Sequence, residues 1–507
     1  MNRRDLLMAS TAIALLPGRG FAMPRFLTDE PFGPDTVETL ARELAAQPYE
    51  PRPEVPAAWR DLTYDEYRTI WFNTSQAVWA RTERPFRMDL FHPGLYYPRA
   101  VAIDVVQEGR AHRLAFDLSL FDRTDQSPEL PVDETMGYSG LRLRTSFDNP
   151  DIFREFVVFQ GASYFRAIGM DMIYGLSARG LALGTGDAEG EEFPDFTRFW
   201  VEEPAPNAET ITVHALLDGP SVTGAYRFVI RPGSACVMDV EATLFPRRPL
   251  EHVGLGALTS MFLYDGTNRW RFKDFRPAVH DSDGLSIWNG AGEMIWRPLT
   301  NPTRLQVSSF VDQGPRGFGL MQRSRALEDF QDFEARYESR PSLWIEPVGD
   351  WGGGVVRLVE IPADQEIYDN VVAYWRPHDA IEPETAFRFA YRMTWFGDPS
   401  DAPARRDVAR VRETLIGDSF NRDRIVAAVD FAPHPSLDGD LEQMTAFISA
   451  SRGEVAPALL QRNPETGGVR LATSFDPGDA EAIEFRAQIV RDGTAVSEVW
   501  IYRWTPE

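Results

Sequence analysis

Apolar and polar residues alternate with a period of two along most of this chain, and that pattern restricts the folds open to it. Residues 113–120, 210–217 and 223–231 show it most clearly, and shorter strand-like runs continue as far as Trp395. Successive side chains of a strand point to opposite faces, so this period indicates half-buried β-strands. Many strands with few helical stretches predict an all-β fold built on a large sandwich rather than on βαβ units.

The composition changes after Phe396. Residues 397–412 are polar and rich in Pro, Asp and Arg, which is typical of a linker, and short alternating runs follow from there to the end. Short strands at regular spacing suggest an immunoglobulin-like sandwich. We therefore expect a large sandwich domain at 23–396, a linker at 397–412 and an immunoglobulin-like domain at 413–507. Helical periodicity is confined to 35–47 and a short stretch near 62–67.

The N-terminus has the pattern of a targeting segment. Arg3 and Arg4 precede an apolar run, and small residues near Ala22 are suited to cleavage before Met23. This predicts a twin-arginine-type signal peptide at 1–22 and export of a folded protein to the periplasm. No other run approaches the ~18 apolar residues of a membrane span, so we expect none after signal removal.

Charge and cysteine content narrow the function classes. The formal net charge of −24 argues against nucleic acid or an anionic membrane as the main partner, and is compatible with a neutral polysaccharide. Cys236 is the single cysteine, so no internal disulfide forms. The 7 histidines show no metal-ligand spacing, and no phosphate-binding loop or nucleophile elbow occurs. We expect no metal and no cofactor.

Residues 280–298 combine several functional side chains on a predicted hairpin with an Asn289-Gly290 turn. Asn-Gly between two apolar runs favours a two-residue type I′ turn, because both central residues then need positive φ. The segment carries a histidine, two carboxylates, an indole and a guanidinium: His280, Asp281, Asp283, Trp296 and Arg297.

Three other runs together supply acids, aromatic rings and arginines. They lie at 159–166, 192–200 and 364–375. Their candidate ligand-binding residues are Tyr164, Arg166, Trp200, Tyr368 and Trp375. Carboxyl groups transfer protons, flat rings cover the apolar faces of sugar rings, and arginines donate to hydroxyl groups. Together these features indicate a groove that processes sugars, although such rings and charges are also common in a buried core.

Glycoside hydrolysis needs one carboxyl group to protonate the leaving oxygen and another to activate water. Asp281 and Asp369 are the best placed, because each lies at a turn-to-strand junction beside aromatic residues. An acidic turn is more often only a turn former. On the residues alone, four other carboxylates remain alternatives: Asp283, Glu293, Asp364 and Glu366.

Six long runs, in this order, are similar to those of a known family. They are FQGASYFRAIG (159–169), YGLSARGLALGTG (174–186), EEFPDFTRFWVEEP (191–204), HDSDGLSIWNGAGEMIWRPL (280–299), RYESRPSLWIEP (336–347) and VEIPADQEIYDNVVAYWRP (359–377). The chain resembles the periplasmic glucans biosynthesis proteins OpgG and OpgD, also called MdoG and MdoD, from about residue 26 to the end. The twin-arginine start looks more like the OpgD branch.

The resemblance implies a galactose-mutarotase-like β-sandwich followed by an immunoglobulin-like domain. It also implies a role in making osmoregulated periplasmic glucans, whose backbone is β-1,2-linked glucose. Members of the family act as β-1,2-glucanases that invert the anomeric centre, or as transglycosylases. Carried over to this sequence, the general acid is Asp369, the general base is Asp281, and Tyr337 takes part in a proton relay between the base and its water.

Two other functions remain open at this point. A non-catalytic glucan-binding or scaffold protein, assisting the membrane glucan synthase in release or branching, would use the same aromatic groove. A mutarotase-like epimerase acting on monosaccharides would need a closed pocket with a base and an acid around one sugar ring. Product analysis on linear β-1,2-glucan discriminates enzyme from binding protein.

Overall fold

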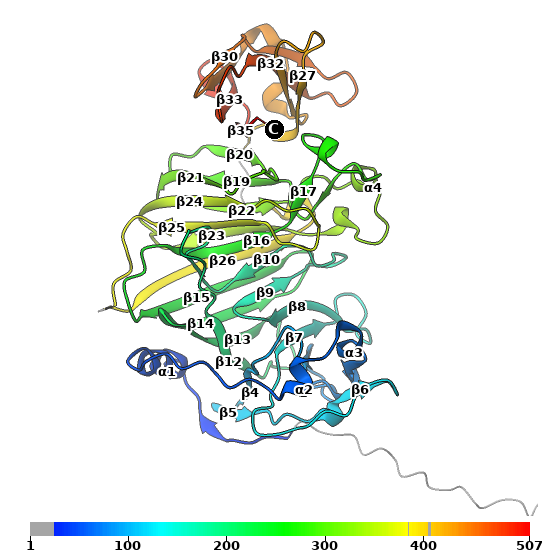
Figure 1. Ribbon diagram of the computed structural model, residues 1–507, viewed down its shortest axis with the longest axis vertical. Coiled ribbons are helices and arrows are strands. Elements are labelled where there is room, and N and C mark those ends of the chain that lie inside the picture. Colours follow the sequence, from blue (N-terminus) through cyan, green and yellow to red (C-terminus); the bar gives the residue numbers. More distant parts are fainter. Residues whose placement is uncertain (1–24, 384, 404–406, 507) are drawn as a thin grey trace, which may run out of the picture.

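The computed structural model describes residues 25–383, 385–403 and 407–506. The described chain is mostly β-strand, which confirms the all-β sandwich expected from the period-two pattern. Figure 1 shows an elongated molecule with a C-terminal lobe at one end and a larger body formed by two extensive sheets. The expected signal peptide at 1–22 lies outside the described residues.

One sheet runs the length of the molecule. Its body strands, in spatial order, are β1 (Glu30–Pro31), β5 (Arg110–Arg113), β4 (Ala102–Gln107), β12 (Asp195–Glu202), β13 (Ile211–Asp218), β14 (Val222–Arg231), β15 (Cys236–Pro246), β26 (Phe387–Phe396), β23 (Ser342–Val348), β22 (Gly317–Met321), β19 (Gly284–Trp288) and β20 (Met294–Pro298). The long neighbours β14 and β15 form the hairpin expected around Pro232 and pair from Val222↔Pro246 to Arg231↔Val237.

The second sheet covers one face of the first. Its strands, in order, are β21 (Gln306–Gln313), β24 (Gly353–Glu360), β25 (Val371–Pro377), β16 (Val253–Ser260), β10 (Ser177–Arg179), β9 (Tyr164–Ala167), β8 (Arg154–Gln160), β7 (Gly140–Thr145) and β3 (Phe86–Phe91), with β11 (Ala182–Leu183) also on β16. Apolar side chains from both sheets form one continuous core, including Phe159 and Phe228, whose ring centroids are 5.2 Å apart.

Helices are few and short. The helix α1 (Thr36–Ala45) matches the predicted helical stretch and packs on β13, β14 and β15, where Val37 and Ala41 are buried. The others are α2 (Ala57–Arg60), α3 (Tyr64–Tyr67) and α4 (Leu327–Phe330). Two small sheets, β2 (Ile70–Phe72) with β6 (Phe121–Arg123) and β17 (Phe262–Tyr264) with β18 (Val279–His280), complete the body.

The C-terminal lobe contains two layers of strands, one a separate sheet and the other part of the long sheet. One has β27 (Val411–Asp418), β28 (Ile425–Phe431), β32 (Val469–Asp476), β30 (Glu454–Val455) and β31 (Leu459–Arg462). The other has β29 (Met444–Ala450), β33 (Ile483–Arg491), β34 (Thr494–Ala495) and β35 (Val499–Trp504). It extends the long sheet of the body, because β35 lies parallel to β20 through the pairs Ile295↔Val499 and Trp296↔Trp500.

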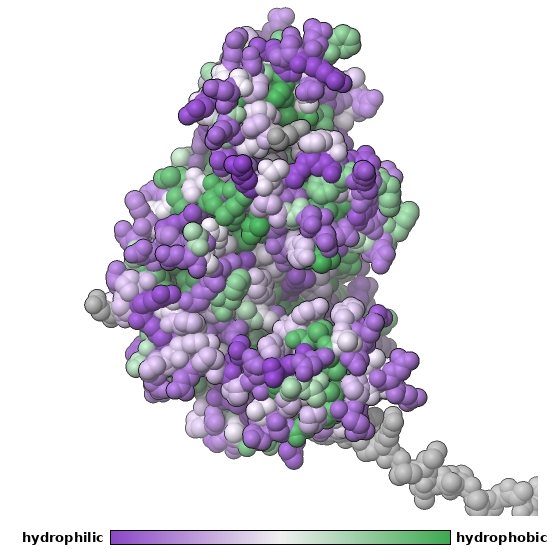
Figure 2. All heavy atoms as spheres, viewed as in Figure 1, coloured by the Kyte–Doolittle hydropathy of each residue, from purple (hydrophilic) through white to green (hydrophobic). Residues whose placement is uncertain are grey.

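The predicted boundaries fall near these elements. The expected linker at 397–412 spans the connection from β26 to β27, although β27 already begins at Val411. The precise domain limits and the immunoglobulin-like and mutarotase-like folds remain predictions. Figure 2 shows mostly hydrophilic residues on the visible face, with scattered hydrophobic patches.

Two local predictions were wrong. The 113–120 run is not one strand: β5 ends at Arg113, and a 3-10 turn at Leu118–Leu120 follows because Asp117 caps it by accepting the Ser119 N–H. The β19–β20 hairpin forms, but pairing stops at Trp288↔Met294 and leaves five residues in the loop, not two. Hydrogen bonds between Asn289 and Glu293, from side chain to side chain and from the Glu293 N–H to the Asn289 side chain, hold this wider loop. The positive φ in the loop is at Gly292, at 88°.

Candidate functional site

The two candidate aspartates, Asp281 and Asp369, lie on loops that are both fastened to the start of β17. The Asp281 N–H donates to the Met261 carbonyl at 2.8 Å. Asn370, directly after Asp369, accepts the Phe262 N–H at 2.8 Å and donates to the Phe262 carbonyl at 3.0 Å. Because residues 261 and 262 are adjacent, these bonds bring the two aspartates to the same part of the surface.

Arginines from three separate elements surround the pair. Arg340, which follows the 3-10 turn η4 (Tyr337–Ser339), forms an ion pair with Asp281. Arg166 on β9 places its guanidinium 3.6 Å from the Asp369 carboxylate. Arg179 on β10 is close enough to lower the pKa of Asp369. The two carboxylates are therefore surrounded by positively charged side chains.

Gly175 explains how Arg340 reaches Asp281. A Cβ at this position would lie 2.9 Å from the Cβ of Arg340. That is closer than side chains normally pack, so a larger residue would displace the arginine. The YGLSARG run therefore contributes Arg179 and, at Gly175, the space that Arg340 needs.

Burial sets the protonation of both carboxyl groups. Asp281 is 4% exposed, and this burial raises its pKa to about 6, although Arg340 opposes the shift and Asp369 adds to it. Burial also raises the pKa of Asp369, against the guanidiniums of Arg166, Arg179 and Arg340. Asp369 is the more open group, with 32% of its side chain exposed. Two carboxyl groups with raised pKa values in one place are a common feature of acid–base sites.

The expected relay residue Tyr337 lies beside the pair. The Arg340 guanidinium lies 4.3 Å from the centre of its ring, and its hydroxyl group donates to Glu366 at 3.2 Å. Glu366 in turn contacts Arg276 at 2.8 Å. Burial raises the pKa of Tyr337, so its hydroxyl remains protonated at neutral pH. In this structure the hydroxyl bonds Glu366, one of the alternative carboxylates, and not Asp281.

Three predicted ligand-binding residues remain accessible near the aspartates. Arg166 has 45% of its side chain exposed, Tyr368 is 51% exposed, and Tyr164 is half-buried with Arg179 5.0 Å from its ring centre. These side chains could contact a sugar without rearrangement of the core.

The expectation of sugar stacking does not fit the three tryptophans Trp200, Trp296 and Trp375. Trp200 is covered by α1, and Trp375 lies in the core between the sheets. Trp296 packs onto Gly284, whose missing side chain leaves room for the ring, and lies 3.5 Å from the Arg323 guanidinium. All three are 4% exposed or less. They belong to the core because both faces of these strands are covered.

Arg297, His280 and Asp283 are also buried and have protein partners. Arg297 pairs with Glu360 at 3.0 Å. His280 bonds the Gln322 side chain at 2.9 Å and stacks on Phe262, and burial lowers its pKa to about 4. Asp283 accepts the backbone N–H groups that follow β22, at 2.8 and 3.0 Å. These contacts shape the turn that carries Asp281.

Sequence reasoning predicted Arg166 but missed Arg340 and Arg179. Arg340 lies 59 positions from Asp281, and Arg179 lies on a different strand from Arg166. The only signal was their presence in the runs RYESRPS and YGLSARG. Nothing in their spacing indicates which carboxylate each one contacts.

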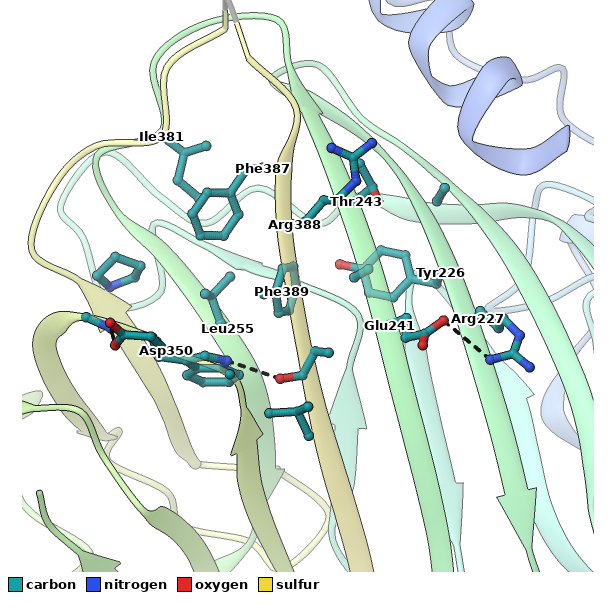
Figure 3. Close-up of a pocket in the computed structure, with 18 of the residues that line it drawn as sticks. Tyr226, Arg227, Glu241, Thr243, Leu255, Asp350, Ile381, Phe387, Arg388 and Phe389 are labelled. Carbon is teal, nitrogen blue, oxygen red and sulfur yellow. Dashed lines mark hydrogen bonds and ion pairs between the residues drawn. The ribbon is translucent and has the colours of Figure 1, made fainter. Parts of the chain in front are cut away.

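A cavity of about 810 Å³ lies elsewhere, at the edge of the body between β26 and the loops at 348–353 and 377–381 (Figure 3). Neither aspartate lines it. Its arginines are paired with carboxylates, Arg227 with Glu241 at 3.3 Å and Arg388 with Glu38 at 2.6 Å. Cavity size alone therefore does not locate the acid pair. Among the residues that the structure describes, no group of three or more His, Cys, Asp or Glu could hold a metal ion.

Comparison with known proteins identifies the family. The family model for the periplasmic glucan biosynthesis protein MdoG matches residues 32–504. The chain belongs to the MdoG family.

Relatives within the MdoG family match this chain over nearly its whole length. Glucans biosynthesis protein G of Rhodopseudomonas palustris (strain BisA53) is 45% identical over 508 residues, covering 100% of both chains. The protein of the same name from Shewanella frigidimarina (strain NCIMB 400) is 47% identical, covering 95% of this chain and 86% of its own. Glucans biosynthesis protein G 1 of Shewanella oneidensis is 45% identical, covering 99% and 92%. These names belong to the G branch, not to the D branch that the twin-arginine start favours.

A solved polysaccharide lyase covers 73% of this chain and 44% of its own at 11% identity, with a TM-score of 0.22. That value is too low to indicate a shared fold. Membership of the MdoG family establishes a role in periplasmic glucan biosynthesis and fits a periplasmic location. No helix in the described part of the chain is long and apolar enough to cross a membrane.

Proposed function

We propose that this protein acts on the β-1,2-glucan backbone as an anomer-inverting β-1,2-glucanase or a related transglycosylase. The observation that carries the proposal is the pair of carboxyl groups, Asp281 and Asp369, whose loops are bonded to the adjacent residues Met261 and Phe262 and whose pKa values are both raised. The six sequence runs that resemble the OpgG and OpgD proteins supply the substrate class.

Asp369 acts as the general acid in this proposal. It is the more exposed of the two carboxyl groups, so a glycosidic oxygen can approach it directly. Protonation of that oxygen lets the sugar leave as an alcohol while water attacks the opposite face of the ring. A bound glucan that moves Arg166 away from Asp369 would raise its pKa further, because it removes a positive charge.

Asp281 acts as the general base, and its burial explains why it needs a relay. At 4% exposed it cannot contact the attacking water directly, but hydroxyl groups and waters can carry the proton to it. Tyr337 is the proposed protein member of that relay. When substrate binds, the Tyr337 hydroxyl would break its hydrogen bond to Glu366 and bond a water of the relay instead.

The pKa of Asp281 also favours a second assignment, in which Asp281 is the acid and Asp369 the base. In the unliganded protein Asp281 holds its proton up to about pH 6. With Asp281 as base, activity falls as the pH drops below about 6, because the group becomes protonated. With Asp281 as acid, activity instead falls as the pH rises above about 6. The direction of the pH dependence of kcat/KM near pH 6 therefore separates the assignments.

Asp369→Asn is the direct test of the acid. On linear β-1,2-glucan we expect turnover to fall by about 10²-fold or more, the typical contribution of a general acid, with substrate binding retained. On a glucoside with an activated leaving group the same variant should recover much of its activity, since that group departs without protonation. Asp281→Asn is the matched control and should lose activity on both substrates.

Chain length and anomeric configuration of the products complete the experiment. Shortened or re-linked glucan of inverted configuration supports the proposal. Glucan that the parent protein binds but leaves unchanged would instead support a glucan-binding scaffold that assists a membrane synthase.

We also propose that export follows the twin-arginine route. Replacing both arginines of the N-terminal pair, as Arg3→Lys with Arg4→Lys, should leave the protein in the cytoplasm, because that pair is the recognition signal. Cell fractionation checks this, and the unrelated Arg19→Lys is the control. Normal periplasmic levels of the double variant would contradict the route.

A further inference from the structure

A crevice of about 630 Å³ lies where the C-terminal lobe meets the body, away from the acid pair. The body contributes the segment around the 3-10 turn η3 (Arg269–Arg271) and residues 300–303. The lobe contributes the ends of β27 and β35 and the start of β28. Neither Asp281 nor Asp369 lines it. Its volume lies in the range of ordinary ligand sites.

Aromatic rings from both sides line this crevice. Trp270 of η3 is 62% exposed, so its indole gains little from the protein core. Trp504 of β35 packs one part of its ring against Phe475, with centroids 5.7 Å apart, and also lines the crevice. Exposed indoles beside a cavity supply a large apolar contact area with a polar tip. That is the surface that the faces of sugar rings require.

The polar lining suits a neutral ligand rich in hydroxyl groups. It consists of hydroxyl groups, amides, two guanidiniums and one carboxylate: Thr267, Asn268, Arg271, Thr300, Asn301, Thr303, Asp418, Tyr502, Arg503 and Thr505. Hydrolysis by acid and base requires two carboxyl groups. Because Asp418 is the only carboxylate among the residues that line the crevice, the crevice is equipped to bind a sugar chain and not to cleave it.

The floor of the crevice is tied to the loop that carries Asp369. The Asn301 side chain donates to the carbonyls of Leu263, at 3.0 Å, and Ala363, at 2.8 Å, and accepts the Ala363 N–H at 3.0 Å. Ala363 lies in the connection between β24 and β25, which ends at Asp369 and Asn370. A chain held in the crevice is therefore held at a fixed position relative to the acid pair.

We infer that this crevice is a second, non-catalytic binding site for a glucan chain, used when the chain is long enough to occupy both places. The ligand class follows from the indoles, the hydroxyl and amide groups of the lining and the established role of the family in glucan biosynthesis. The inference rests on the proposed function only for the choice of the β-1,2-linked backbone as probe.

The test compares Trp270→Ala with Phe275→Ala, both in the background of Asp369→Asn so that bound chains are not consumed. Phe275 is the matched control, since it is an aromatic residue of the same segment, 74% exposed, that does not line the crevice. Isothermal titration measures binding of size-fractionated linear β-1,2-glucan and of a short oligosaccharide. We expect Trp270→Ala to weaken binding of the long chain about tenfold, as loss of one aromatic contact does. Its effect on the short chain should be smaller, and Phe275→Ala should bind both as its parent does.

Equal binding by the Trp270→Ala and Phe275→Ala variants overturns the inference. Turnover by the parent protein is measured in parallel, so the two proposals fail separately. Trp270-dependent binding without any turnover supports the crevice and removes the proposed catalysis. Turnover without an effect of Trp270→Ala on binding supports the proposed catalysis and removes the crevice as a binding site. Absence of both binding and turnover overturns both proposals.

Discussion

At the scale of single residues, Asp281 is a carboxylate in a place that disfavours its charge. Burial raises its pKa to about 6 from an ordinary value of 3.8, even with Arg340 in contact. The folded state therefore binds an extra proton between about pH 4 and pH 6, and its stability falls as the pH rises through that window. Such a cost is typical of groups retained for chemistry and not for folding.

Asp281→Asn should for this reason stabilise the protein at pH 8. The expected gain in the free energy of unfolding is on the order of 1–3 kcal/mol, since one pKa unit corresponds to about 1.4 kcal/mol. At pH 4 the gain should largely vanish, because the wild-type carboxyl group is then protonated when folded. Denaturant unfolding at both pH values measures this, with Asp125→Asn, on an exposed loop, as the control. Destabilisation at pH 8 that shrinks at pH 4 would show that the Arg340 contact outweighs burial.

At the scale of elements, the loop between β24 and β25 matters because buried amides hold it in place. Asn370 is 2% exposed, and besides its two bonds to Phe262 it donates to the Ile361 carbonyl at 3.0 Å. Asn301 holds the other part of the loop through Ala363. The position of Asp369 thus depends on side chains that take no part in the proposed chemistry.

Asn370→Ala should loosen this loop. It leaves the Phe262 N–H and carbonyl unpaired in the interior, at a cost of about 1–3 kcal/mol for each unsatisfied group. We expect faster hydrogen exchange across 361–370 and a larger loss in turnover than in glucan binding. Asn463→Ala is the control, since that side chain also bonds backbone groups, accepting two N–H groups, but lies at a turn that is only partly buried. A loop that exchanges as slowly as in the parent would contradict this account.

At the scale of the whole molecule, the C-terminal lobe is joined to the candidate site through a buried ion pair. Arg323 contacts the Glu498 carboxylate with two bonds of 2.8 Å, and Glu498 is 1% exposed and also accepts the Val411 N–H. The Arg323 N–H donates to Asp283, two residues after Asp281. With the β20–β35 pairing, this makes lobe and body one continuous structure.

Glu498→Gln should therefore affect more than the lobe. Removing one partner of a buried pair typically costs about 3–5 kcal/mol, because the other charge remains buried. We expect a lower melting temperature and reduced activity, since the turn with Asp281 loses its support. Asp430→Asn is the control, as its partner Arg470 has 36% of its side chain exposed and the pair lies within the lobe. A loss no greater than that of the control would indicate that the lobe and the site are independent.

By itself the sequence determined most of the strands, the β14–β15 hairpin and the one long helix, since period-two and helical patterns depend on neighbouring residues. It also singled out Asp281 and Asp369, through local runs that resemble a known family. It did not determine which aromatic residues are accessible: Tyr368 and Trp375 lie seven positions apart in one run, yet one is exposed and the other lies in the core.

Only the tertiary structure decided how the site is assembled. Arg340 reaches Asp281 from 59 positions away, Asn370 bonds Phe262 across 108 positions, and Glu498 meets Arg323 across 175. Such contacts depend on how sheets pack and which strand faces are covered, and no local pattern encodes them. The same packing buries Trp200, Trp296 and Arg297, which the sequence suggested as ligand contacts.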